Sequence, residues 1–221
     1  MKLYSDTGFA GKPLLSLRLS WRSLHVAALM LSLLALSIGA GAAQTAKPPT
    51  AKPQTAQPRD HVYLLRGAFN IFSLGMDEIA ERLERMGVYA TVNNYLSWQS
   101  LADEAAAEYK AGRLRNIILV GHSSGAIAVT EMAARLGQFG VPVKLAIGLD
   151  PTSREVASGN VGRYINYYIA NGMGNAVVRG KQFNGVLQNI DVEKNPALGH
   201  FNIDKNHALQ EQVIREIRAA L

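Results

Sequence analysis

A serine near the middle of the chain stands in a setting that can make a weak nucleophile reactive. The pentapeptide GHSSG, residues 121–125, comes directly after the apolar run 116–120 and directly before a helix-like stretch over 126–136. A sharp turn from strand to helix strains the serine backbone and holds its hydroxyl out toward a base. Glycines two residues before and after the serine fit such a turn, because larger side chains would collide across it. The pattern predicts that Ser123 is a nucleophile.

His122 adjoins Ser123 and has the right chemistry for a base. Neighbouring side chains in an extended segment point to opposite faces, however. We therefore expect His122 to pack or to form hydrogen bonds rather than to accept the serine proton. An ordinary glycine-rich turn between a strand and a helix is the alternative reading of the pentapeptide.

Short apolar runs alternate with helical patterns from residue 61 onward. The runs predict strands over 62–65, 88–92, 116–120, 143–149, 164–169 and 186–190. Amphipathic spacing predicts helices over 76–86, over 126–136 and at the C-terminal end, and Ser100 with Asp103 indicates a capping box that opens a helix to about Ala111. The alternation predicts an α/β fold with a mainly parallel, doubly wound sheet of about six strands and helices on both faces.

This arrangement resembles the α/β-hydrolase superfamily over roughly residues 61–221. The resemblance rests on GHSSG, Asp150 and His200, and it points to small members similar to serine esterases, lipases or thioesterases. It implies the chain order nucleophile, acid, histidine. In that fold the histidine lies between the last strand and the last helix, which favours His200 as the base. His207 is the alternative, but it falls at the first turn of the closing helix.

The acid is harder to place, because superfamily members usually carry it after the penultimate strand. The corresponding loop here, 170–185, contains no Asp or Glu. Asp150 ends the next strand after the strand-to-helix turn at Ser123 and its helix, on the same sheet edge as Ser123, and some lipases of the superfamily take their acid from this strand. We therefore predict Asp150 as the acid. Asp191 is the alternative, and Asp150 could instead simply begin the turn at Pro151.

The resemblance also implies an oxyanion hole made of two backbone N–H groups. It assigns one of them to Ser124, the residue after the nucleophile. The other belongs to the loop after the first strand, where Ala68 is the preferred residue and Phe69 the alternative. Arg66 and Asn70 flank this loop and either bind substrate or tie the loop down.

The first sixty residues lack the composition of a folded domain. A basic start leads into the apolar stretch 26–38 and then into small residues, the order of a secretory signal peptide. We expect residues 1–43 to be such a signal peptide or, alternatively, an uncleaved anchor that associates with a membrane through residues 24–42. Residues 44–60, rich in Pro, Thr, Ala and Lys, predict a flexible linker. Residues 61–221 are then the folded domain.

Charge and cysteine content exclude several classes of function. Residues 1–60 carry seven Lys and Arg against two Asp, whereas residues 61–221 carry sixteen against fifteen Asp and Glu. The excess of basic over acidic residues therefore lies almost entirely outside the predicted domain, and it gives no reason to expect a nucleic-acid partner. The chain has no cysteine, which excludes a thiol nucleophile and a thiolate metal site. Its five histidines are scattered, so we expect no metal and no cofactor.

Together these features predict an exported serine hydrolase, periplasmic or secreted, that cleaves an ester or thioester of a small-molecule or lipid-like acyl substrate. The linkers 151–162 and 170–185 are too short for a helical cap, so an open site is expected. Two alternatives remain. An acyltransferase would use the same residues, and a non-catalytic hydrolase-fold binding protein of the cell envelope would need no acid at all.

Overall fold

The computed structural model describes residues 57–68 and 73–221. The predicted signal peptide or anchor, most of the predicted linker, and both Phe69 and Asn70 lie outside the described residues. Within the described ranges, no helix is both long enough and apolar enough to cross a membrane.

Six strands of the described chain form one sheet in the order β2-β1-β3-β4-β6-β8, and all of its pairings are parallel. The order turns back on itself at β1, which lies between β2 and β3. Ligands bind outside the carboxyl ends of the strands at such a switch point. The strands are β1 Arg59–Arg66, β2 Ala90–Asn94, β3 Leu114–His122, β4 Val143–Leu149, β6 Val161–Tyr168 and β8 Val186–Asp191.

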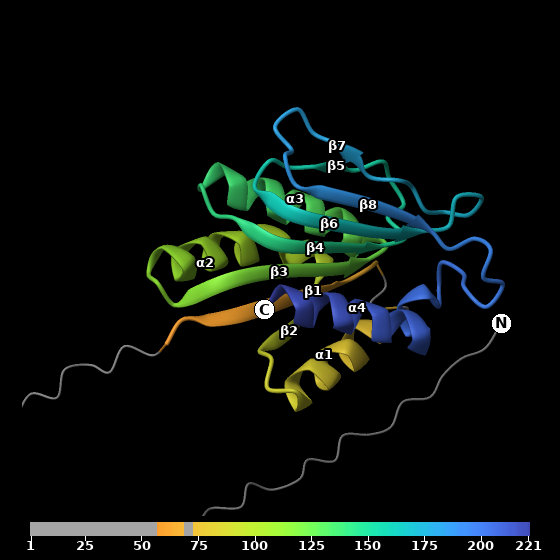
Figure 1. Cartoon of the computed structure of the whole chain (residues 1–221), viewed down its shortest axis with the longest axis horizontal. Helices are drawn as coiled ribbons and strands as arrows, with labels where there is room; N and C mark the ends of the chain where they lie inside the picture. Colours follow the sequence, from red (N-terminus) through yellow and green to blue (C-terminus); the bar gives the residue numbers. More distant parts are fainter. Residues whose placement is uncertain (1–56, 69–72) are drawn as a thin grey trace, which may run out of the picture. The chain divides into compact units, whose positions relative to one another are not determined.

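Helices cover both faces of the sheet (Figure 1). On one face α1 (Gly75–Arg85) packs beside α4 (His207–Ala220), and on the other α2 (Trp98–Lys110) packs beside α3 (Ser124–Gln138). Alternate residues of β3 enter the two cores: Ile118 and Val120 pack with α1 and α4, whereas Leu119 packs with α3. Because β3 is buried on both sides, its sequence is a continuous apolar run rather than an alternating one.

Most element boundaries differ from the expected ones by one to three residues, and two of the differences have an identifiable cause. The second strand begins at Ala90 rather than Val88, because the N–H of Val88 still bonds the carbonyl of Leu83 at the end of α1. The predicted capping box at Ser100 is wrong. A short 3-10 turn, η1 (Tyr95–Ser97), leads directly into α2 at Trp98, and the Ser100 hydroxyl donates to the carbonyl of Ser97.

Two very short strands, which the sequence did not suggest, connect the loops that follow β4 and β6. β5 (Val156–Ala157) pairs in parallel with β7 (Val178–Arg179) beside the main sheet. Neither linker contains a helix. The architecture is therefore that of a minimal α/β-hydrolase fold without a large cap, as expected.

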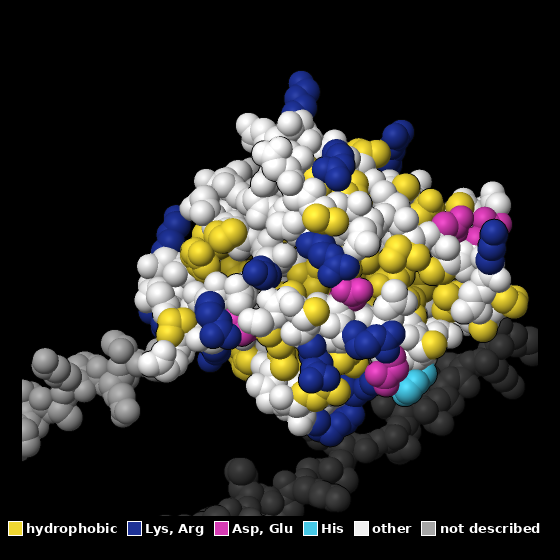
Figure 2. All heavy atoms as spheres, in the orientation of Figure 1, with side chains coloured by type: hydrophobic (Ala, Val, Ile, Leu, Met, Phe, Trp, Pro, Cys, Tyr) yellow, Lys and Arg dark blue, Asp and Glu magenta, His cyan; other side chains and the backbone are white. Residues whose placement is uncertain are grey.

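Charged side chains are spread over the face shown in Figure 2, where Lys and Arg alternate with apolar and acidic groups. Several of the cations are paired: Arg82 contacts Glu211, and Arg163 lies 2.6 Å from Glu216. The first pair links α4 to α1, and the second links α4 to β6.

Candidate active site

Ser123 forms the turn between β3 and α3 in a backbone conformation that few side chains adopt. Its φ is +57° and its ψ is −122°. Such a conformation stores strain on the order of 1–3 kcal/mol and persists only where the surroundings impose it. Here the N–H of Ser123 donates to the carbonyl of Leu149 at 2.9 Å, and its carbonyl accepts from the N–H of Ala126. The turn is thus held from β4 on one side and from α3 on the other.

The two glycines of the pentapeptide allow the chain to approach itself closely. A Cβ on Gly121 would lie 2.2 Å from the carbonyl oxygen of Gly125, and one on Gly125 would lie 2.1 Å from that of Leu65. Both distances are far below a van der Waals contact. The prediction that a larger side chain would collide across this turn is confirmed for Gly121, whereas a side chain at Gly125 would collide with β1 instead.

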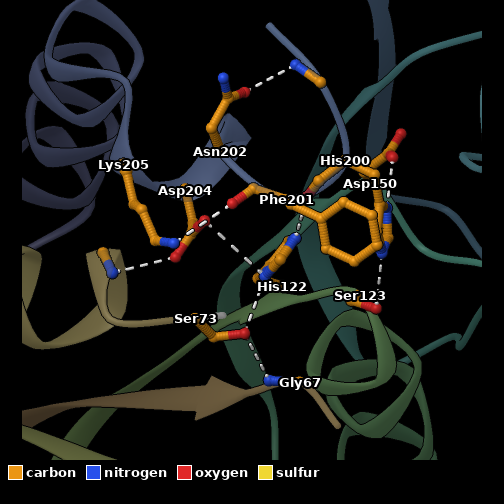
Figure 3. A network of polar contacts seen from close by, with 12 residues as sticks. Gly67, Ser73, His122, Ser123, Asp150, His200, Phe201, Asn202, Asp204 and Lys205 are labelled. Atoms are coloured by element: carbon orange, nitrogen blue, oxygen red, sulfur yellow. Dashed lines mark hydrogen bonds and ion pairs between the residues drawn. The ribbon is translucent and has the colours of Figure 1, made fainter. Parts of the chain in front are cut away.

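A continuous series of hydrogen bonds runs from Ser123 through His200 to Asp150 (Figure 3). The Oγ of Ser123 lies 3.0 Å from Nε2 of His200, and Nδ1 of His200 lies 2.7 Å from Oδ2 of Asp150. Because a carboxylate only accepts, Nδ1 carries the proton in the neutral ring. Nε2 is therefore the acceptor that faces the serine hydroxyl.

Asp150 is held at the end of β4 by its neighbour β6. The residue is fully buried and has a φ of +54°. Its own N–H donates to the carbonyl of Tyr167 at 2.8 Å, and its Oδ1 accepts the N–H of Ile169 at 2.8 Å. With Oδ1 occupied in this way, Oδ2 is directed at His200.

The two alternative residues lie elsewhere. Asp191 accepts hydrogen bonds from the backbone N–H groups of Ala170 and Glu193 and so fixes a turn after β8. The side chain of His207 is 81% exposed on α4 and lies 3.7 Å from Glu211. The structure thus brings Ser123, His200 and Asp150 together and leaves Asp191 and His207 outside the group.

A pocket of about 300 Å³ opens beside Ser123 at the carboxyl edge of the sheet. The backbone N–H groups of Ala68 and Ser124, both at this pocket, form no hydrogen bond with any described residue. The N–H of Gly67 is already used, because it donates to Oγ of Ser73 at 2.9 Å. The pocket is lined by Ala68, Ser73, His122, Ser123, Ser124, Thr152, Met173, His200 and Phe201.

Arg66 ties the end of β1 to α1 through a bidentate contact with Asp77 and so serves the second of its two expected roles. Of the two candidates for the second oxyanion donor, Ala68 is described and lies at the pocket, whereas Phe69 is outside the described residues. The described ranges contain no group of His, Asp and Glu side chains arranged to hold a metal ion.

His122 lies beneath the pocket and links two loops. Its Nδ1 is 2.8 Å from Oγ of Ser73, and its Nε2 is 2.7 Å from the backbone carbonyl of His200. Burial lowers the pKa of His122 to about 4, so the ring is neutral at pH 7. The expectation that His122 forms hydrogen bonds is confirmed.

Asp204 is a buried carboxyl group that sequence reasoning did not identify. Its Oδ2 accepts the N–H of Gly75 at the start of α1 at 2.9 Å, and its Oδ1 lies 3.9 Å from Nδ1 of His122. Oδ1 has no hydrogen-bond partner among the described residues. Burial raises the pKa of this carboxyl group to about 6. Neither Asp204 nor Ser73 belongs to a motif, so no sequence pattern could have singled them out.

No protein-family model matches the chain, and no curated protein is similar to it. Solved structures similar to it include a hydrolase of the α/β superfamily from Xanthomonas campestris pv. campestris, with a TM-score of 0.48 and 15% identity over 73% of this chain and 99% of the other. A gene product of Listeria innocua has a TM-score of 0.46 and 11% identity over 70% and 92% of the two chains. The type II thioesterase BorB from the borrelidin biosynthetic cluster has a TM-score of 0.41 and 10% identity over 76% and 95%. These are similarities of fold at low identity. The strand order of the chain and its strand-to-helix turn at Ser123 themselves identify a minimal α/β-hydrolase fold.

Proposed function

We propose that this protein is a serine hydrolase that cleaves an acyl ester or thioester through an acyl-enzyme intermediate. The observation that carries the proposal is the hydrogen-bonded series from Ser123 through His200 to Asp150. A serine in this series has a base within reach of its proton and an acid that orients the base. The series lies at the edge of a pocket that a substrate can enter.

The geometry supports a definite sequence of steps. Oγ of Ser123 attacks the acyl carbonyl carbon while Nε2 of His200 takes its proton. The carbonyl oxygen becomes an oxyanion, which accepts hydrogen bonds from the N–H groups of Ala68 and Ser124. Asp150 stabilises the imidazolium, which then gives its proton to the leaving oxygen or sulfur. Water then attacks the acyl-enzyme in the same way and releases the acyl group as a carboxylic acid.

The rim of the pocket favours a substrate with an apolar part. Met173 and Phe201, both about half exposed, stand at the pocket that holds Ser123. A volume of about 300 Å³ is at the small end of the range for ligand pockets, which favours a small-molecule or short lipid-like acyl group. With no cap in the described structure, the site is open to solvent and to bulky leaving groups.

Export to the periplasm or to the medium is part of the proposal and rests on residues 1–43 alone. Their basic, apolar and small-residue order supports a signal peptide or an anchor. Mass spectrometry of the mature N-terminus after expression in a bacterial host tests it: a chain that begins near Gln44 supports cleavage, and an intact chain in the soluble cytoplasmic fraction contradicts export.

A serine-reactive fluorophosphonate tests the catalytic proposal before any substrate is known. We expect the folded wild-type protein to be labelled on the peptide that contains Ser123 and the Ser123→Ala variant to remain unlabelled. Ser153→Ala is the matched control, because Ser153 is an exposed serine bonded to Glu155 and its loss should leave labelling unchanged. Absence of labelling in well-folded wild type would favour the non-catalytic binding protein instead. Products formed from acyl esters and thioesters of graded length, with and without a competing alcohol, then distinguish hydrolysis from acyl transfer.

A further inference from the structure

Two loops that are far apart in the chain meet beneath the pocket, on either side of His122. One follows β1 and carries Gly67 and Ser73, and the other precedes α4 and carries His200. Figure 3 shows His122 between them. The links are short: Gly67 N to Ser73 Oγ is 2.9 Å, Ser73 Oγ to His122 Nδ1 is 2.8 Å, and His122 Nε2 to the His200 carbonyl is 2.7 Å.

The protons of this chain of hydrogen bonds can be arranged in only one way. The carbonyl of His200 can only accept, so Nε2 of His122 carries a proton. The neutral ring then accepts at Nδ1, which requires the Ser73 hydroxyl to donate there. The remaining lone pairs of Ser73 accept the N–H of Gly67. Ser73 and His122 are each only 1% exposed, so water does not compete for these bonds.

Ser73, His122 and Asp204 have the residue types of a second Ser-His-Asp triad, but their geometry excludes that role. Asp204 lies nearest to Nδ1, the same nitrogen that accepts the Ser73 proton. The other ring nitrogen is occupied by the carbonyl of His200. His122 therefore has no free nitrogen with which to move a proton to a substrate, and its function must be another one.

We propose that His122 is a positioning residue that, together with Ser73, holds two loops in register: the loop that carries the proposed base His200 and the oxyanion loop, which carries Gly67 and Ala68. Through Nε2 it fixes the backbone of His200, whose imidazole must reach both Ser123 and Asp150. Through Ser73 it fixes Gly67, the residue before the oxyanion donor Ala68. The inference rests on the proposed function, because only a reaction at Ser123 needs both loops in place at once.

Two substitutions at one site separate this role from a purely structural one. In His122→Asn the amide oxygen lies near the position of Nδ1 and can still accept from Ser73, but the side chain is too short to reach the carbonyl of His200. In His122→Gln the longer side chain places an amide N–H near the position of Nε2 and can still donate to that carbonyl. Both variants remove the imidazole, so they differ mainly in which loop they release.

The rate constant for fluorophosphonate labelling of Ser123 is the measurement, with folding checked by circular dichroism and urea unfolding. Displacements of about 1 Å in a catalytic group slow reactions by about 100-fold. We expect a loss of about that size in His122→Asn, with substantial recovery in His122→Gln. Ser73→Ala should slow labelling less than His122→Asn, and its effect should not multiply with that of His122→Gln, because the bond between Ser73 and residue 122 is already lost there.

Equal losses in the Asn and Gln variants, or losses that follow only the folded fraction, would overturn the inference. Multiplicative effects of Ser73→Ala and His122→Gln would also overturn it. If His122→Asn fails to fold, the same question is answered by Ser73→Ala against His122→Gln, which release the oxyanion loop alone and should slow labelling similarly. Failure of the proposed function has a different signature, because the wild-type protein itself would then remain unlabelled.

Discussion

Nδ1 of His200 donates to Oδ2 of Asp150 across 2.7 Å, although fifty positions of the chain separate the two residues. The bond joins the end of β4 to the loop between β8 and α4. The loop after β6, where an acid is usual in the superfamily that the sequence resembles, contributes the N–H of Ile169 instead, which holds the carboxylate in place.

Replacing Asp150 by Asn should therefore reduce turnover of an activated ester by about 10³- to 10⁴-fold, because an amide no longer fixes the His200 tautomer or stabilises its charged form. The similar shape of Asn preserves the bond from Ile169, so the fold should persist. Asp191→Asn is the control and should change turnover little, since Asp191 bonds only backbone N–H groups. The reverse ranking of the two variants would refute the assignment of the acid.

His200→Ala should abolish measurable labelling and turnover, because Ser123 loses the acceptor 3.0 Å from its hydroxyl. His207→Ala should behave like the wild type, because the His207 ring is exposed and contacts only Glu211 on its own helix. Steady-state rates of both variants on the same ester decide this. A large loss in His207→Ala alone would show that the base has been misassigned.

Gly125→Ala should lower the free energy of unfolding by about 1–3 kcal/mol or more, because the new methyl group would meet the carbonyl of Leu65 at 2.1 Å and push α3 away from β1. Gly199→Ala is a matched control, since its Cβ would meet nothing closer than 3.7 Å. Urea unfolding followed by circular dichroism measures both. Equal stability of the two variants would contradict the close approach of helix and strand.

Asp204 should make the protein less stable as pH rises from about 4 to about 6. Its pKa is raised from 3.8 to about 6 in the folded state, so the folded protein binds the proton more tightly than the unfolded chain does. The resulting stabilisation is fully present below pH 3.8 and is lost as pH rises through 6. Asp204→Asn, which can still accept from Gly75, should therefore gain stability relative to wild type between pH 4 and pH 7.5, on the order of 2 kcal/mol. A difference in unfolding free energy that does not change with pH would contradict this.

His122 acts in the opposite direction over an overlapping range of pH. Its pKa is lowered from 6.5 to about 4, so its contribution to stability is present above pH 6.5 and is lost as pH falls toward 4. For this reason the Asp204 effect must be measured as a difference between variant and wild type at each pH. Because Oδ1 of Asp204 lies 3.9 Å from Nδ1 of His122, this difference includes any change in the His122 contribution.

The fold could be predicted well where local pattern and burial agree. The strand 143–149 was predicted with the bounds that β4 has, because a short apolar run there ends at an Asp-Pro turn. The start of α2 was missed because Ser100 and Asp103 fit a capping pattern, whereas the chain had already entered the helix through the turn at Tyr95–Ser97. Strands of two residues, such as β5 and β7, leave no periodicity to detect.

Of the candidate site, the sequence predicted only the residues proposed to be catalytic. Ser123, Asp150 and His200 each occupy a position that the resemblance to α/β-hydrolases defines. Ser123 and Asp150 follow strand ends, and His200 lies in the loop between the last strand and the last helix. Ser73 and Asp204 act through contacts between segments 49 and 129 positions apart, Ser73 with His122 and Asp204 with Gly75. A single sequence contains no trace of such pairings. They become visible only once β3, the start of α1 and the segment before α4 are packed together.

The proposed acid lies at the end of β4. Two tasks that a single loop often combines, supplying the acid and lining the pocket, are therefore carried by different segments. The segment between β6 and β7 supplies Met173 to the wall of the pocket, whereas its contact with the proposed proton relay is the backbone N–H of Ile169 that holds Asp150. Substitutions at Met173 can therefore reshape the wall while Ser123, His200 and Asp150 keep their mutual distances. Under the proposed function, Met173 is therefore the first position at which to vary substrate preference.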